Sequence, residues 1–235
     1  MNGRKNGIMR ISISRVISGI LCILLLAGCA KEMMGPQGEL GFESQDFTAI
    51  VTVHKSPTDT IYFQVDDTTR LFPTNYYGTY TGLERIVCGI TVFKEIVPNY
   101  GYRTSVDWFD QLDKGTFTTS KPAGSNDGLD ILSDWMTSCE DGFLTLHYST
   151  WWGDGSVPHT FTLVSGQNPS DPYEVLLVQN ANGDGREGGK GDSIVYFDIN
   201  TLPDTGDSYK TLTLKWTDSG GKAAEKEFRF KTRRP

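Results

Sequence analysis

From residue 47 onward, polar and apolar residues alternate with a period of two in short stretches that turn-forming residues separate. Successive side chains of a β-strand point to opposite faces of a sheet, so this alternation predicts strands buried on one face. No stretch of this region has the 3.6-residue apolar spacing of a long amphipathic helix. The pattern therefore predicts an all-β fold, and 26 glycines suit the many turns that it needs.

The predicted strands form two groups on either side of a polar, turn-rich segment from Ser120 to Gly128. The first group, with its glycine breaks, fits a small OB-like β-barrel over residues 46–121. The second group has the number and spacing of strands typical of a β-sandwich, over residues 122–235. The strands are expected at 47–53, 60–65, 85–94 and 102–112 in the barrel, and at 143–151, 159–164, 173–179, 193–198, 209–216 and 225–232 in the sandwich.

The N-terminal segment predicts export from the cytoplasm. A basic stretch precedes an apolar run from Val16 to Leu26, which is too short for a membrane-spanning helix of about 20 apolar residues. Leu26-Ala27-Gly28-Cys29 then resembles the lipobox of bacterial lipoproteins, in which the cysteine thiol accepts the diacylglycerol. An ordinary signal peptide with an incidental cysteine is the alternative.

We therefore expect a signal peptide over residues 1–28 and an N-acyl diglyceride, with fatty acids such as palmitate, on Cys29. Residues 29–45 carry turn formers without periodicity and are expected to be a tether. Ala30 stands where an aspartate would favour retention in the inner membrane, so the outer membrane is the expected location. The sequence does not decide between its periplasmic and its surface-facing side.

The charge of the chain excludes one class of partner. The net charge is -7, whereas a nucleic-acid surface needs a clustered basic footprint. The basic residues between Lys222 and Arg234 alternate with Glu225, Glu227 and aromatic residues, which is typical of the solvent face of a last strand. Cys88 alternates with apolar neighbours and is predicted to be buried, while a disulfide with Cys139 stays open as the alternative.

No catalytic set can be assembled from the sequence, so we predict that the chain is not an enzyme. The three histidines, His54, His147 and His159, have no catalytic spacing around them, and no Gly-x-Ser-x-Gly motif occurs. Glu140 and Asp141 are adjacent, and adjacent strand residues cannot both face one substrate.

A cofactor is not expected, although one segment has part of a calcium loop. Asn180, Asn182 and Asp184 occupy the first three ligand positions of an EF-hand loop, but Gly191 stands where the bidentate glutamate belongs. A glycine-rich hairpin is the simpler interpretation.

Five aromatic residues are candidates for ligand binding by stacking. Tyr76, Tyr77 and Tyr80 cluster in one loop of the first half, and Trp151 and Trp152 are consecutive in the second. Consecutive strand residues point to opposite faces, so one tryptophan is expected in the core. That all of these residues pack structurally remains the alternative.

The second half also carries a family resemblance. The stretch Glu140–Gly153, the strand at 159–164, the turn at 180–184 and the closing Leu212–Trp216 resemble the NigD-like lipoproteins of Bacteroidetes. The resemblance implies an N-terminal OB-like domain and a C-terminal β-sandwich, and it implies no biochemical activity.

The sequence thus favours a non-catalytic binding or accessory lipoprotein of the envelope, held at the membrane by its lipid and engaging a protein or envelope partner. The alternative is a glycan-binding lipoprotein of an outer-membrane uptake system, which an exposed row of aromatic residues with neighbouring Asp and Asn would favour.

Overall fold

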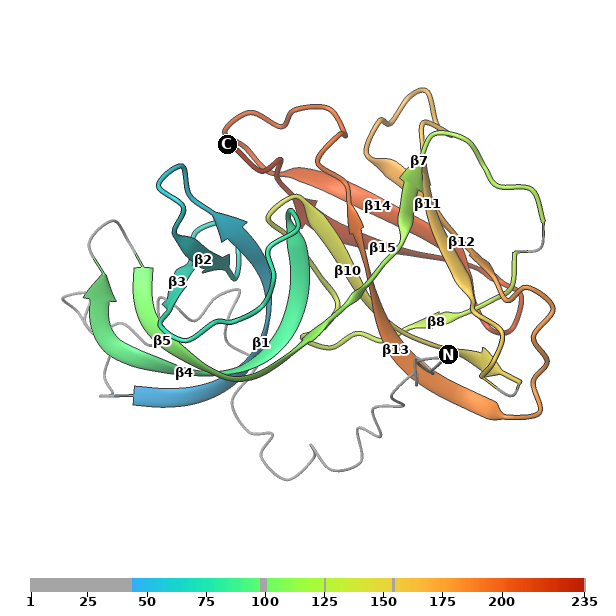
Figure 1. The fold of residues 1–235 in the computed structure, drawn as a ribbon. Helices are drawn as coiled ribbons and strands as arrows, with labels where there is room; N and C mark the ends of the chain where they lie inside the picture. The colour runs from blue at the N-terminus through green and yellow to red at the C-terminus, as the bar shows by residue number, and fades with distance from the viewer. Residues whose placement is uncertain (1–43, 98–100, 125, 154, 235) are drawn as a thin grey trace, which may run out of the picture.

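A computed structural model describes residues 44–97, 101–124, 126–153 and 155–234. This part of the chain consists of strands and their connections and contains no helix, hence none long and apolar enough to cross a membrane. The strands form a closed barrel and a two-layer sandwich, which lie next to each other in Figure 1. The all-β prediction is confirmed. The predicted signal peptide, Cys29 and most of the predicted tether lie outside the described residues.

The barrel contains five strands, and its order β1-β2-β3-β5-β4 closes on itself because β1 also pairs with β4. All of its pairs are antiparallel except that between β3 and β5. The predicted strands correspond to β1, β2, β4 and β5, and β3 is an addition. The bounds are β1 Ser44–Lys55, β2 Ile61–Gln64, β3 Arg70–Pro73, β4 Glu84–Val97 and β5 Gly101–Gln111.

The alternation of apolar and polar residues along the strands explains which side chains form the barrel core. Ala49 and Val51 of β1 lie opposite Cys88 and Ile86 of β4, and all four side chains are buried. Phe63 of β2 belongs to the same core and is fully buried. Burial of such a side chain stabilises a fold by about 1.5–3 kcal/mol.

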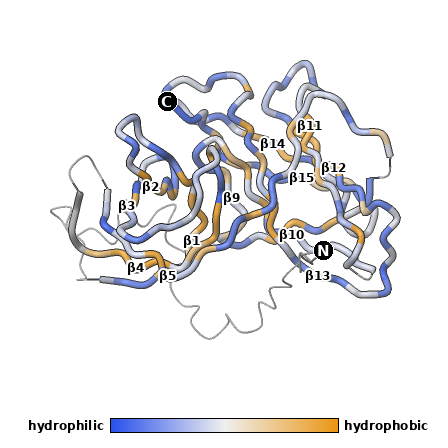
Figure 2. Tube along the Cα trace, viewed as in Figure 1, coloured by the Kyte–Doolittle hydropathy of each residue, from blue (hydrophilic) through white to orange (hydrophobic). Residues whose placement is uncertain are grey.

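The sandwich packs two sheets against each other. One has the order β6-β13-β10-β8, with β9 also paired to β10, and the other has the order β15-β14-β12-β11-β7. Figure 2 shows apolar residues concentrated along the strands, while the connecting loops are largely hydrophilic. The bounds are β6 Asp113–Lys114, β7 Thr116–Thr118, β8 Asp130–Ile131, β9 Ser138–Glu140, β10 Phe143–Trp152, β11 Thr160–Ser165, β12 Glu174–Asn180, β13 Gly189–Asp198, β14 Lys210–Thr217 and β15 Ala223–Phe230.

The boundary between the domains lies at the end of β5, whereas the sequence predicted it between residues 121 and 122. β6 pairs with β13, and β7 pairs with β11, so both short strands belong to the sandwich. The polar segment from Ser120 to Gly128 connects β7 to β8 within the sandwich. It resembled an interdomain linker because long loops inside a domain have the same composition. β1 likewise begins at Ser44, two residues before the predicted barrel.

The two described cysteines are free thiols in different domains. Cys88 lies inside the barrel and Cys139 lies in β9, and both are buried. Burial raises the pKa of the Cys88 thiol to about 12 and raises that of Cys139 well above its ordinary value. The expectation of a buried, apolar Cys88 agrees with this environment.

Because the thiolate is the reactive form, both thiols are expected to resist alkylation in the folded protein. In a chain that begins at Ala30, iodoacetamide at pH 8 should leave Cys88 and Cys139 unmodified, and concentrated guanidinium should expose both. Mass spectrometry of the intact chain counts the adducts. Rapid labelling of Cys88 without denaturant would contradict the closed barrel.

Candidate functional site: the barrel end and the junction between the domains

One end of the barrel is closed by aromatic side chains. Tyr76 packs edge-on against the core residue Phe63, with ring centroids 5.1 Å apart, and lies at the same distance from Phe109 of β5. Tyr80 also packs against the barrel core, and the ammonium of Lys55 lies 5.9 Å from its ring centroid. Tyr76 and Tyr80 therefore have structural contacts, and burial raises the pKa of Tyr76.

Tyr77 differs from its two neighbours because its side chain points out. It is 75% exposed, and its ring lies 5.4 Å from that of Phe109. The side-chain amide of Asn75 fixes the loop below it, accepting from the Val106 backbone N–H at 2.7 Å and donating to the Val106 carbonyl at 3.0 Å. Tyrosine, with tryptophan and arginine, is enriched among the residues that contribute most to binding at protein interfaces.

A second exposed aromatic residue, Trp108, follows from an irregularity in β5. The pairing of β4 with β5 shifts between Gly89 and Ile90, so that Asp107 is an extra residue on β5. Trp108 consequently faces the outside of the barrel, 44% exposed, with its indole lying over Gly89, where a Cβ would overlap the ring. Such β-bulges often re-aim a side chain at a functional site. Trp108 lies within the strand predicted at 102–112, and the polar Asp107 beside it is the signal in the sequence for its exposure.

The consecutive tryptophans of β10 face opposite sides, as their spacing requires. Trp152 packs against the sandwich core and stacks on His159, with ring centroids 4.0 Å apart. Trp151 lies on the other face, with the cations of Arg186 and Lys190 5.6 and 5.4 Å from its ring centroid. Both tryptophans are half-buried.

All three histidines contact carboxylates and join segments that are distant in sequence. His147 lies between Asp134 and Asp192, with nitrogen–oxygen distances of 2.6 and 3.1 Å. His159 Nε2 lies 3.1 Å from Asp184 Oδ2, and its other ring nitrogen contacts the side chain of Gln179 at 2.9 Å. Both ring nitrogens of His147 and of His159 thus contact carboxylate or amide groups. These contacts give His147 and His159 a structural role.

The residues of the calcium candidate hold a turn together. The Asn180 side chain accepts from the Asn182 backbone N–H at 2.8 Å, and Asn182 donates to the Pro158 carbonyl at 2.6 Å. The Asp184 carboxylate accepts from the Gly153 N–H at 2.8 Å as well as contacting His159. Throughout the ranges that the structure describes, no group of three or more His, Cys, Asp or Glu side chains is placed to hold a metal ion.

The two domains meet at the tip of the β9–β10 hairpin. Glu140 pairs with Phe143, so Asp141 and Gly142 form a two-residue turn, and both have positive φ, 52° and 72°. Asp-Gly is a favoured sequence for this turn. The barrel binds the tip at two points: His54 Nε2 lies 2.6 Å from the Asp141 carboxylate, and Asp67 accepts from the Asp141 backbone N–H at 2.9 Å.

Two arginines flank the first residue after this turn. Arg85 of β4 and Arg233, beyond β15, place their guanidinium carbons 5.6 and 4.6 Å from the ring centroid of Phe143. Arg85 is 1% exposed and donates to Thr52 Oγ1 at 3.1 Å, and its burial lowers its pKa to about 10. Arg233 donates to the Asp141 carbonyl at 2.7 Å. Neither arginine was singled out by the sequence analysis for this position.

The junction also changes the titration of Glu140. Burial, followed by the nearby charges of Asp67 and Asp66, raises its pKa to about 7. Arg85 and a hydrogen bond from the Asp67 backbone act in the opposite direction. Glu140 was excluded from a catalytic carboxylate pair on the basis of the sequence. With this pKa it changes charge near neutral pH at the contact between the domains.

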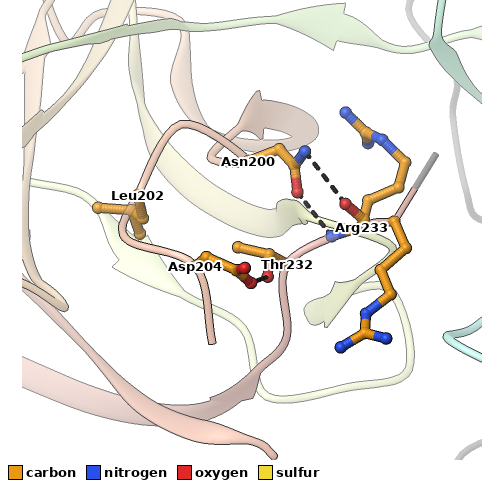
Figure 3. Close-up of a pocket in the computed structure, with 6 residues that line it drawn as sticks. Asn200, Leu202, Asp204, Thr232 and Arg233 are labelled. Atoms are coloured by element: carbon orange, nitrogen blue, oxygen red, sulfur yellow. Dashed lines mark hydrogen bonds between the residues drawn. The ribbon is translucent and has the colours of Figure 1, made fainter. Parts of the chain in front are cut away.

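A hollow of about 590 Å³ lies beside this junction and is open to solvent. Figure 3 shows the Asn200 side chain bonded to the backbone of Arg233, and Thr232 bonded to Asp204. Asn200 accepts from the Arg233 backbone N–H at 2.6 Å, and Thr232 donates to Asp204 at 2.8 Å. These groups already have partners, so the hollow has the character of a surface depression between two chain segments.

The sandwich is also recognised by sequence. A profile of the NigD-like C-terminal beta sandwich domain matches residues 113–230. The chain belongs to the NigD-like family. The match begins at the first residue of β6 and so coincides with the boundary in the structure. No curated protein matches the NigD-like chain significantly.

Solved structures share the fold of this NigD-like protein over both domains. A candidate toxin-related protein from Parabacteroides distasonis is 21% identical, with a TM-score of 0.64, over 80% of this chain and 94% of that one. A NigD-like immunity protein from Bacteroides caccae is 16% identical, with a TM-score of 0.54, over 77% and 91%. A candidate lipoprotein from Bacteroides fragilis is 14% identical, with a TM-score of 0.50, over 80% and 99%.

Replacing Glu140 by glutamine is expected to stabilise the NigD-like protein at pH 8 and to leave it unchanged at pH 4. The pKa of this carboxyl rises from 4.5 to about 7 on folding, so between these pH values the folded state binds more protons than the unfolded state. The stability of the wild-type protein therefore falls as pH rises from 4.5 to 7. The gain at pH 8 should reach up to about 3 kcal/mol. Urea unfolding at several pH values measures it, and equal stability of the two proteins at pH 8 would contradict the assignment.

Gly142→Ala is expected to destabilise the NigD-like protein more than Gly166→Ala. Both glycines have φ of 72°, where alanine costs about 1–2 kcal/mol. A Cβ at Gly142 would in addition lie 2.6 Å from Asn200 Oδ1, whereas the space around Gly166 is open. Urea unfolding of both variants gives the difference, and equal losses would show that the turn does not need its close packing.

Proposed function

We propose that this NigD-like protein is a lipid-anchored component of the outer membrane that binds a protein partner and catalyses no reaction. The observation that carries the binding role is the exposed ring of Tyr77 on its fixed base. The anchor rests on the Leu26–Cys29 motif, and the name of the Bacteroides fragilis structure supports it. The names of the compared structures, which include an immunity protein, point to no enzyme.

The distribution of aromatic residues favours a protein partner over a glycan. A row of exposed rings would suit sugar stacking, but the large exposed apolar or aromatic side chains of the described part are Tyr77, Trp108 and Tyr209. Tyr209 lies in the sandwich, with the Arg229 guanidinium carbon 4.1 Å from its ring centroid. Protein interfaces are enriched in tyrosine and tryptophan, and a few such residues contribute most of the binding energy.

Substitution of Cys29 by alanine should leave the chain without lipid, because no other side chain can replace the thiol. The variant should move from the membrane to the soluble fraction of its host and should not incorporate labelled palmitate. Cys22→Ala is the matched control, since this cysteine lies within the apolar part of the predicted signal peptide. A Cys29→Ala chain that still incorporates palmitate would overturn the anchor.

A photo-crosslinking residue tests the binding role in the intact envelope. Placed at Tyr77 of the full chain, it should give a discrete crosslinked protein. At Tyr209, the exposed aromatic of the other domain, it should not. Lack of any product at Tyr77 would remove the proposed binding surface.

A further inference from the structure

The exposed aromatic residues flank an open strand edge. β3 pairs with β5 from Gly101 to Thr104, and the Asn75 side chain then takes the place of a strand at Val106. From Asp107 to Gln111, no described strand pairs with this edge of β5. An open edge can accept an extended segment of another protein by backbone pairing.

Both faces of this edge carry an exposed aromatic side chain. Trp108 lies on the outer face over Gly89, and Tyr77 lies on the other side against Phe109, the next residue of β5. A segment along the edge would therefore meet one ring on each of its sides. Neither ring depends on the segment for its position, because Asn75 and the bulge already fix them.

The charges along the edge have one sign. Asp107 and Asp110 are exposed and form no hydrogen bond or ion pair with any described residue. Glu84 lies at the same end, where its carboxylate accepts from Gln111 at 3.2 Å. The exposed cation of β5, Arg103, lies before the bulge, in the stretch that pairs with β3. The edge thus combines unneutralised carboxylates with aromatic faces, and both attract lysine and arginine.

We infer that the edge of β5 from Asp107 to Gln111, with Tyr77 and Trp108, binds an extended lysine- or arginine-rich segment of a partner protein. This inference rests on the proposed function and names the class of partner. The carboxylates attract the segment, and its side chains pack on the two rings. A chain with net charge of -7 gives such a segment a favourable long-range field as well.

The test uses the full chain purified in detergent and a fluorescent 12-residue peptide of alternating lysine and serine. A peptide with glutamate in place of lysine is the comparison. Tyr77→Ala combined with Trp108→Ala should weaken binding of the basic peptide at least about tenfold, since exposed aromatic anchors dominate such contacts. Asp107→Asn combined with Asp110→Asn should weaken it and reduce its salt dependence.

Glu225→Gln combined with Glu227→Gln removes the same charge from β15 of the sandwich and should leave binding unchanged. Equal loss in this control would show general attraction to an acidic protein and overturn the inference. Failure of the basic peptide to bind better than the acidic one would overturn it too. If crosslinks still form at Tyr77 in that case, the proposed function stands and only the partner class is wrong.

Discussion

The contact of Phe143 with Arg85 and Arg233 holds the two domains in one arrangement. Burial of a guanidinium is costly unless its charge finds compensation, and Arg85 obtains it from an aromatic face, a hydroxyl and the nearby carboxylates. Arg233 reaches the same ring from the end of the sandwich. Each cation comes from a different domain, so separation of the domains would leave Arg85 without its ring. The orientation of the β9–β10 hairpin follows from this constraint.

The strands of the fold could be predicted because their signal is local. Alternation in β1, β4 and β10 reports directly which side of each strand is buried. The closed barrel also followed from sequence. β6, β7, β8 and β9 have two or three residues each, too few for a period of two to stand out, and β3 ends in a proline, which argues against a strand. The domain boundary was displaced for the same reason, since two of these short strands decide which domain the segment joins.

The candidate site was predicted in part. Tyr77 was among the named aromatic residues, and the structure separates it from Tyr76 and Tyr80, which close the barrel. Exposure of Trp108 depends on the bulge at Asp107, which a strand pattern does not reveal without its partner strand. The raised pKa of Glu140 depends first on burial at the junction and then on the charges of Asp67 and Asp66, more than 70 residues earlier in the chain. Such properties arise from pairing between distant segments and leave no local signal.

The pairing of β1 with β4 also decides how the protein would carry a mechanical load. Ser44 lies at one end of β1, and the contacts of Thr52 and His54 with the junction residues lie near the other. Ten residues of β1 pair with β4 between Ser44 and Val53. Tension between residue 44 and the sandwich would run along the strand and stretch these hydrogen bonds together, in shear. A sheet loaded in this direction must break several of these hydrogen bonds at once, and they cannot open one after another.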